Sequence, residues 1–131
     1  MAVDMVNRPP HYTFGTVEVI DFIDSMGAGY DFATGNAIKY IARADHKGNK
    51  VEDLKKARFY VQHILDKQMR YNPDIDPTCK PELIDPCFVA RDWKLSNNLR
   101  DALIEIVVGG RKNLEGAIAD LTREIEKAEK L

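Results

Sequence analysis

Cationic and hydrogen-bonding side chains recur at helical spacing in the middle of the chain, between residues 32 and 48. At about 100° per residue these side chains fall on one side of a helix, whereas Ile38, Ile41 and Ala42 fall on the other. Arginine offers a planar fork for a phosphate, lysine a point charge, and asparagine and tyrosine directional hydrogen bonds. The pattern therefore predicts either a surface that binds phosphate and a nucleotide base, or an ordinary solvated outer face. The residues of this predicted face are Asn36, Lys39, Tyr40, Arg43 and Lys47.

The distribution of charge favours a small anionic ligand over a long polyanion. The formal net charge of the 131 residues is only -2. From Asp31 to Arg70, however, nine Lys and Arg stand against five Asp and Glu, while from Tyr71 onward nine stand against twelve. A nucleic acid would need an extended basic surface, which this balance does not provide. We therefore expect no extended nucleic-acid binding.

Composition predicts a single core and a cytoplasmic protein. A hydrophobic content of 44% is ordinary for a globular domain. The first ten residues show no basic-then-apolar signal pattern, and no apolar run approaches the length of a membrane span. The two cysteines, Cys79 and Cys87, lack zinc-site spacing. Free thiols are favoured over a local disulfide in a reducing compartment.

The pattern of the first half predicts an all-α fold built on a helical hairpin. A first helix is expected from a Thr16 cap to Met26, where Gly27 stops it. The central helix is expected to end at Gly48. A third helix then runs from about Lys50 to Arg70, with Asn49 and Glu52 as a capping box. The short glycine-containing turn makes the second and third helices antiparallel neighbours. Lys47, Lys50 and the start of the third helix then form a second candidate anion site.

The rest of the chain predicts an appendage to this hairpin. Residues 7–12 form an extended arm, because paired prolines exclude a helix there. We divide the chain into a helical domain with its arm (1–70), a Pro-rich linker or loop (71–92) and a C-terminal helical pair (93–131). The pair is expected over about 96–108, stopped by Gly109 and Gly110, and about 113–130. The last helix carries a short coiled-coil-like seam that must pack on the first part or on another subunit, so we expect a homo-oligomer. The seam comprises Leu114, Ile118, Leu121, Ile125 and Ala128.

Familiar nucleotide-binding signatures are missing. No glycine is followed by the Lys-Ser/Thr of a Walker loop, and no strand–Gly–helix unit is predicted. Glu18, Asp21 and Asp24 share one face of the first helix at three-residue spacing, as a divalent metal site or a solvated surface. Any phosphoryl chemistry would therefore depend on cationic side chains, helix N-termini and a carboxylate-held metal.

Three sequence blocks resemble a bacteriophage family described as SaV-like or phage nucleotide kinase. They are a Pro-x-His-Tyr arm ending at Tyr12, a Gly-Asn-x-x-Lys-Tyr-x-x-Arg helix ending at Arg43, and an Asp-Leu-x-Lys-Ala-x-x-Tyr helix ending at Tyr60. The resemblance covers about residues 7–66. It implies a nucleotide-binding protein of the infected host cytoplasm, and favours a (deoxy)nucleoside monophosphate kinase without a Walker loop, with ATP as phosphate donor.

The resemblance also assigns roles. Arg43 and Lys39 would hold and stabilise the transferred phosphate, with His11 delivered from the arm as the third catalytic residue. Asp53, with Asp21 or Glu18, would hold Mg²⁺. The nucleotide-binding residues would be Tyr12, Asn36, Tyr40, Lys47, Lys56 and Tyr60.

Three other functions remain open at this point. The first is a non-catalytic phage sponge, an anti-defence protein that sequesters a host signalling (cyclic) nucleotide and releases it unchanged. The second is an all-α nucleotide pyrophosphatase, in which Glu18, Asp21, Glu52 and Asp53 bind metals from paired helices. The third is a structural or assembly protein whose functional part is the C-terminal helices.

Overall fold

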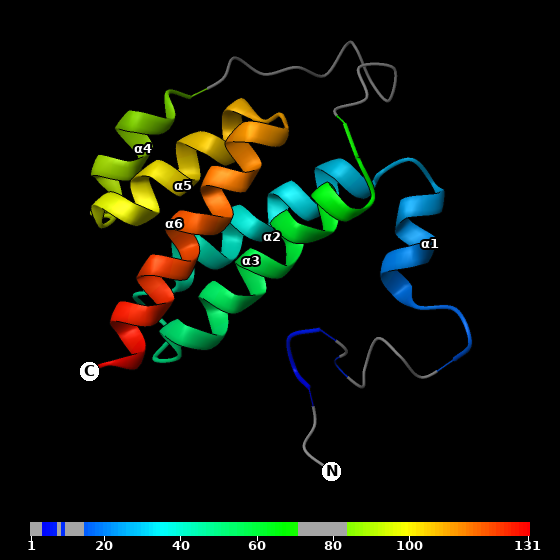
Figure 1. Cartoon of the computed structure of the whole chain (residues 1–131), viewed down its shortest axis with the longest axis horizontal. Coiled ribbons are helices and arrows are strands. Elements are labelled where there is room, and N and C mark those ends of the chain that lie inside the picture. Colours follow the sequence, from blue (N-terminus) through cyan, green and yellow to red (C-terminus); the bar gives the residue numbers. More distant parts are fainter. Residues whose placement is uncertain (1–3, 8, 10–14, 71–83) are drawn as a thin grey trace.

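The computed structural model describes residues 4–7, 9, 15–70 and 84–131, and over these residues every regular element is a helix (Figure 1). The predicted all-α fold class is confirmed. No helix in the described part of the chain is both long and apolar enough to span a membrane. The helices are α1 (Val19–Ser25), α2 (Gly29–Arg43), α3 (Lys50–Asp66), α4 (Pro86–Asp92), α5 (Asn97–Val108) and α6 (Arg111–Glu129).

The predicted antiparallel hairpin is formed by α2 and α3. The two helices approach each other closely, because alanines occupy buried positions on both of them. The large side chains Ile41, Leu54 and Val61 fill the remaining space and are inaccessible to solvent. Burying each such side chain stabilises the fold by about 1.5–3 kcal/mol. The hairpin is therefore a rigid support for side chains on its outer face.

The central helix ends five residues earlier than its pattern predicts. α2 stops at Arg43, and the amides of His46 and Lys47 both donate to the Arg43 carbonyl, at 2.9 and 3.2 Å. Gly48 has φ +78°, which an L side chain adopts only at a cost, and it reverses the chain toward α3. The helical pattern continues to Gly48, but the chain needs the residues between Arg43 and Gly48 to turn from α2 toward α3. Lys47 consequently lies in the connection and not on the helix face.

Asn49 begins α3 as predicted, but the capping box forms only in part. The Asn49 Nδ2 donates to Glu52 Oε2 at 2.6 Å, and neither side chain caps a backbone amide. α3 ends at Asp66 and not at Arg70, since the chain turns at Gln68 with φ +53°.

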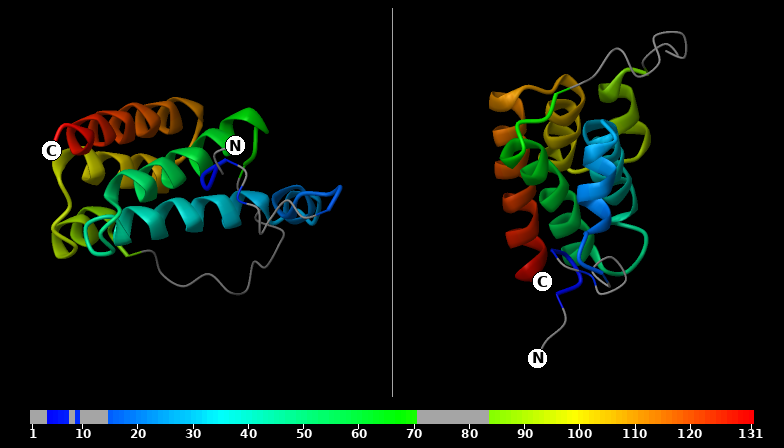
Figure 2. Two further views of the ribbon diagram at one scale, coloured as in Figure 1. Left: turned by 90° about the horizontal axis from the view of Figure 1, so that it is seen from below. Right: turned by 90° about the vertical axis from the view of Figure 1, so that its right-hand side faces the viewer.

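The C-terminal helices pack on the hairpin (Figure 2). The Ser96 hydroxyl caps α5 by accepting from the Leu99 amide at 3.3 Å, and Gly109 and Gly110 end that helix as predicted. α6 lies against both α3 and α5, and one core includes residues of all four long helices. The seam of α6 is thus covered within the chain, with Leu114, Leu121 and Ile125 buried. The homo-oligomer stays a prediction, but the seam of α6 no longer supports it, because the seam is covered by the chain's own helices.

Two segments differ from their predicted form. α4 arises within the predicted linker, because Asp85 caps the Cys87 amide at 2.9 Å and Pro86 occupies the first turn. Cys87 is free and exposed, while Cys79 lies outside the described residues. α1 begins at Val19 and not near Thr16. Its N-cap is Glu18, whose side chain does not cap a backbone amide of the helix, and Gly27 ends the helix with φ +83°.

α1 lies against the hairpin without a fully buried residue, and a polar contact ties it to α3. Within α1, Phe22 is 61% exposed. Asp24 Oδ2 and His63 Nε2 lie 2.7 Å apart and tie α1 to the C-terminal half of α3. α2 starts directly beside this contact at Gly29, where a Cβ atom would collide with the Asp24 carboxylate.

A carboxyl pair lies between α5 and α6. Glu105 faces Asp120, whose other neighbour is Arg123. Burial, a hydrogen bond with Asp120 and repulsion from Asp120 and Asp101 raise the pKa of Glu105 from 4.5 to about 7, although Arg123 opposes the shift. At neutral pH this pair therefore retains a proton for part of the time.

Candidate functional site

Three cations converge on one aromatic ring on the outer face of the hairpin. Lys39 Nζ, Lys56 Nζ and Arg43 Cζ lie 5.0, 5.4 and 5.5 Å from the centroid of the Tyr40 ring. All three distances fall within the range of a cation–π interaction. Lys39 and Arg43 flank Tyr40 on α2, whereas Lys56 comes from α3 and reaches the ring only because the hairpin closes. We call Lys39, Tyr40, Arg43 and Lys56 the cation cluster.

Arg43 is oriented by a buried carboxylate behind it. Its Nε lies 3.3 Å from Asp53 Oδ2, and Asp53 is only 2% exposed. The two atoms form an ion pair but are not aligned as a hydrogen bond, and neither has another hydrogen-bond partner. The Arg43 side chain is itself 40% exposed. Asp53 thus holds one edge of the guanidinium and leaves the group accessible to a solvent-side anion.

The two lysines of the cluster carry charges that no described carboxylate balances. Within the described residues, neither Lys39 nor Lys56 forms an ion pair. Of the carboxylates that the structure describes, only Asp53 pairs with the cluster, and its partner is Arg43. The described site therefore combines one partly neutralised guanidinium with two ammonium groups that no described carboxylate pairs with.

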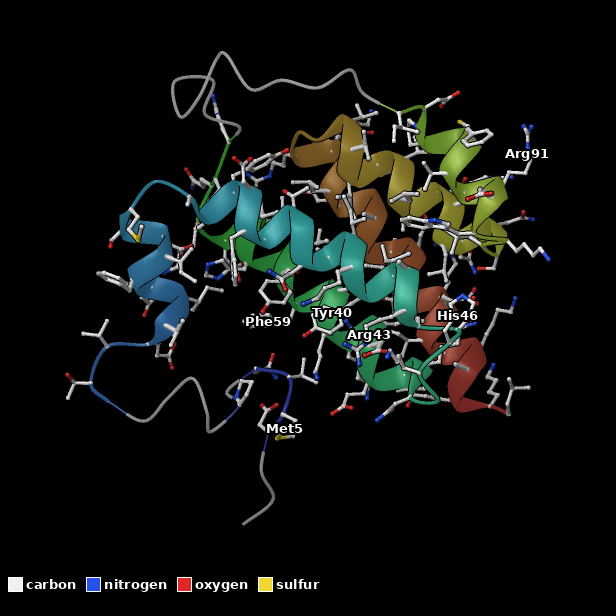
Figure 3. The ribbon with its side chains drawn as sticks, turned by 180° about the vertical axis from the view of Figure 1, so that it is seen from behind. Met5, Tyr40, Arg43, His46, Phe59 and Arg91 are labelled. Atoms are coloured by element: carbon white, nitrogen blue, oxygen red, sulfur yellow. The ribbon has the colours of Figure 1, made fainter. Side chains whose placement is uncertain are left out.

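An aromatic row continues from the cluster toward α1. The rings of Tyr40 and Tyr60 are nearly parallel, with centroids 6.2 Å apart and an interplanar angle of 9°. Phe59 and Phe32 meet Tyr60 edge to face, at 5.3 and 5.9 Å. Figure 3 shows Phe59, Tyr40 and Arg43 in this order along the hairpin, with Phe59 nearest α1 and Arg43 nearest the turn at His46.

A cavity of about 190 Å³ opens at the α1 end of this row. Its walls are mostly apolar and come from the N-terminal segment, α1, α2 and α3, four parts of the chain that only the tertiary structure brings together. Tyr60 belongs both to this wall and to the aromatic row. The lining residues are Val6, Asn7, Pro9, Glu18, Val19, Ile20, Ile23, Phe32, Phe59 and Tyr60.

The structure gathers five of the residues predicted from sequence, namely Lys39, Tyr40, Arg43, Lys56 and Tyr60. Asn36 lies one turn before Tyr40, but its Nδ2 donates to the Phe32 carbonyl at 2.8 Å, so the amide is partly engaged by its own helix. Lys47 is exposed in the connection after α2. His11 and Tyr12 lie outside the described residues.

The carboxylates predicted to hold Mg²⁺ belong to opposite ends of the hairpin. Asp21 is exposed one turn before Asp24, which contacts His63 on α3. Asp53 lies ten residues before His63 along α3, a distance of roughly 15 Å at 1.5 Å per residue. Among the residues that the structure describes, no group of three or more His, Cys, Asp or Glu side chains is arranged as a metal site.

The second candidate anion site, at the start of α3, is occupied by internal ion pairs. Lys50 Nζ lies 2.9 Å from Asp45 Oδ1 and 3.1 Å from Glu124 Oε2. Burial lowers the pKa of Lys50, but the hydrogen bonds and attraction from the two carboxylates outweigh it and raise the pKa. The same lysine, with Asn98, overcomes the effect of burial on Glu124 and lowers the pKa of that carboxyl. Lys50 therefore joins α3 to α6 and is not available to an anion.

Sequence reasoning missed the cavity and its aromatic walls. Phe32 and Phe59 look like ordinary core residues in a helical pattern, and Ile20 and Ile23 like the apolar face of a short helix. The one available signal is that α1 is too short to bury that face fully.

Comparison with known proteins contradicts the family predicted from the sequence blocks. No curated protein and no solved structure matches this chain. The resemblance to the phage nucleotide kinase family is wrong, because the family that matches is of unknown function and no nucleotide kinase family matches. Residues 6–62, which include the cation cluster and every residue lining the cavity, are similar to the family described as "Protein of unknown function (DUF3310)".

Proposed function

We propose that the cation cluster binds the phosphates of a nucleotide. The observation that carries this proposal is the convergence of Lys39, Arg43 and Lys56 on the Tyr40 ring, where the one carboxylate paired with them among the described residues is the buried Asp53. Phosphate oxygens accept charge-assisted hydrogen bonds from ammonium and guanidinium groups. Clustered positive charges repel one another, and an anion relieves that repulsion.

An ordinary solvated surface explains this arrangement less well. Lys39 and Arg43 are near neighbours of Tyr40 on α2, but Lys56 is brought to the same ring from α3. Three cations therefore lie within 5.5 Å of the centroid of one ring. Other cations of the described chain, such as Lys55, Lys94 and Lys112, also form no ion pair, but they do not gather on one aromatic ring.

Two versions of the proposal differ in what happens to the ligand. In the catalytic version the protein transfers phosphate from Mg-ATP to a (deoxy)nucleoside monophosphate, with Lys39 and Arg43 stabilising the transferred group. In the other version the protein sequesters a nucleotide and releases it unchanged. The state of Asp53 favours sequestration, since the cluster's carboxylate is buried and paired with Arg43 and so is poorly placed to accept a proton from a substrate.

Binding is tested by titration calorimetry at low ionic strength, with ATP, AMP, dTMP and a cyclic dinucleotide as ligands. We expect Lys39→Gln and Lys56→Gln each to weaken binding of a nucleotide roughly tenfold, because a hydrogen bond to a charged group contributes about 1.5–3 kcal/mol before screening. Affinity should also fall as salt is added.

The matched control is Lys55→Gln, which removes the same charge from the neighbouring position of α3 but lies outside the cluster. We expect its affinity to stay within twofold of the unaltered protein. If Lys55→Gln and Lys56→Gln weaken binding equally, the effect is one of net charge and the cluster is not the site.

Turnover is tested by incubating the protein with Mg-ATP and the monophosphate panel and separating all nucleotides by ion-exchange chromatography. Diphosphate products that are lost in Lys39→Gln support the catalytic version. Tight binding with unchanged nucleotides supports sequestration. If no nucleotide binds at millimolar concentration, both versions are refuted.

A further inference from the structure

We infer that the apolar cavity beside Tyr60 receives the base of the nucleotide whose phosphates occupy the cation cluster. The inference rests on the proposed function and adds the placement of the ligand to it. The nucleotide would lie along the outer face of the α2–α3 hairpin, with its base against α1 and its phosphates toward the α2–α3 turn.

The volume of the cavity is suited to a single base. An apolar cavity of about 150 Å³ accommodates a benzene molecule, whereas pockets that enclose a drug-sized ligand measure about 300–1,000 Å³. At about 190 Å³, this cavity has room for a base but not for a whole nucleotide. The sugar and the phosphates would therefore have to lie outside it.

The walls of the cavity suit a flat aromatic group. Phe32, Phe59 and Tyr60 border it on the hairpin side, and Ile20 and Ile23 of α1 border it on the other. Aromatic side chains contact ring systems favourably by face or by edge, and the aliphatic side chains supply apolar contact. Asn7 and Glu18 make the lining partly polar, and the Nδ2 of Asn7 donates to Asp4 Oδ2 at 3.0 Å.

The cation cluster lies near enough to the cavity for one nucleotide to reach both. The Tyr60 ring, which lines the cavity, lies 6.2 Å from the Tyr40 ring, and the cations lie 5.0 to 5.5 Å from Tyr40. No cation can be farther from Tyr60 than these two distances combined. This is the scale of a ribose with its first phosphates, so one molecule can reach both places.

The test compares a nucleoside triphosphate with inorganic tripolyphosphate, which carries the phosphates without a base. We expect the nucleotide to bind at least tenfold more tightly to the unaltered protein. Ile23→Trp fills the cavity and should remove that difference while leaving the affinity for tripolyphosphate within twofold. The matched control is Phe22→Trp, which introduces the same side chain at the adjacent, exposed position of α1.

A second variant guards against displacement of α1 by the bulky tryptophan. Ile23→Ala enlarges the cavity without a steric clash and should weaken nucleotide binding several-fold, again without affecting tripolyphosphate. Circular dichroism should show unchanged helix content, since α1 contributes no buried residue to the core.

Failure of this inference differs from failure of the proposed function. If tripolyphosphate and the nucleotide bind equally well, or if Ile23→Trp and Phe22→Trp behave alike, the base does not enter the cavity although the cluster binds phosphate. If hexyl phosphate binds as tightly as a nucleoside monophosphate, the cavity receives an alkyl chain and not a base. If neither tripolyphosphate nor the nucleotide binds, the proposed function itself is wrong.

Discussion

Replacing Arg43 with alanine should destabilise the fold as well as remove a phosphate ligand. The substitution leaves Asp53, which is 2% exposed, without its ion-pair partner. Breaking a buried pair costs about 3–5 kcal/mol, whereas an exposed pair contributes at most about 1 kcal/mol. Because Asp53 is buried but Arg43 is 40% exposed, we expect an intermediate loss of roughly 2 kcal/mol.

Thermal and urea unfolding, followed by circular dichroism at 222 nm and pH 7, measure this loss. For a domain of this size, about 2 kcal/mol corresponds to a decrease in Tm of roughly 6–12 °C. Asp53→Asn in the Arg43→Ala background removes the unpaired charge and should recover about half of the loss. Lys39→Ala is the matched control, because Lys39 is exposed and forms no ion pair with a described residue, and its Tm should change by less than 2 °C.

A Tm of Arg43→Ala equal to that of the unaltered protein would refute this account, as would the absence of any recovery in the double variant. The result also affects how binding is measured. Arg43→Ala is a poor test of phosphate binding unless its stability is known, whereas Lys39→Gln and Lys56→Gln leave no buried carboxylate unpaired.

Two further predictions concern stability and α1. The pKa of Glu105 is about 7 in the folded protein against an ordinary 4.5, so between pH 4.5 and 7 the folded protein binds more protons than the unfolded chain. The contribution of Glu105 to stability is therefore complete below pH 4.5 and is lost as the pH rises through 7. The Tm should therefore fall between pH 5 and pH 8 less steeply in Glu105→Gln than in the unaltered protein, and equal slopes would contradict the assignment. Gly29→Ala should displace the Asp24 carboxylate from His63 and speed hydrogen exchange of the α1 amides. Gly35→Ala is the control, because nothing lies within 4 Å of the added Cβ, and it should stabilise α2 by roughly 0.5–1 kcal/mol. If the α1 amides exchange at similar rates in Gly29→Ala and Gly35→Ala, Asp24 does not hold α1.

The helices were predictable because their signals are local. Apolar periodicity placed α2, α3, α5 and α6, and the glycines at 27, 109 and 110 marked helix ends correctly. Errors arose where a helical pattern continued beyond the residues that could remain helical. The clearest case is the end of α2, where the reversal at Gly48 forces the helix to stop at Arg43.

The sequence by itself determined that Arg43 lies next to both Lys39 and Tyr40 on the surface of one helix, because side chains three and four positions apart are neighbours on a helix. Only the tertiary structure decided which other charges reach that face. Closure of the hairpin brings Lys56 to Tyr40, whereas packing of α6 neutralises Lys50 through Glu124, which is far away in sequence. The cavity likewise exists only after four segments have packed together. Contacts between distant segments depend on how whole helices fill space, and the periodicity of a single helix carries no record of its neighbours.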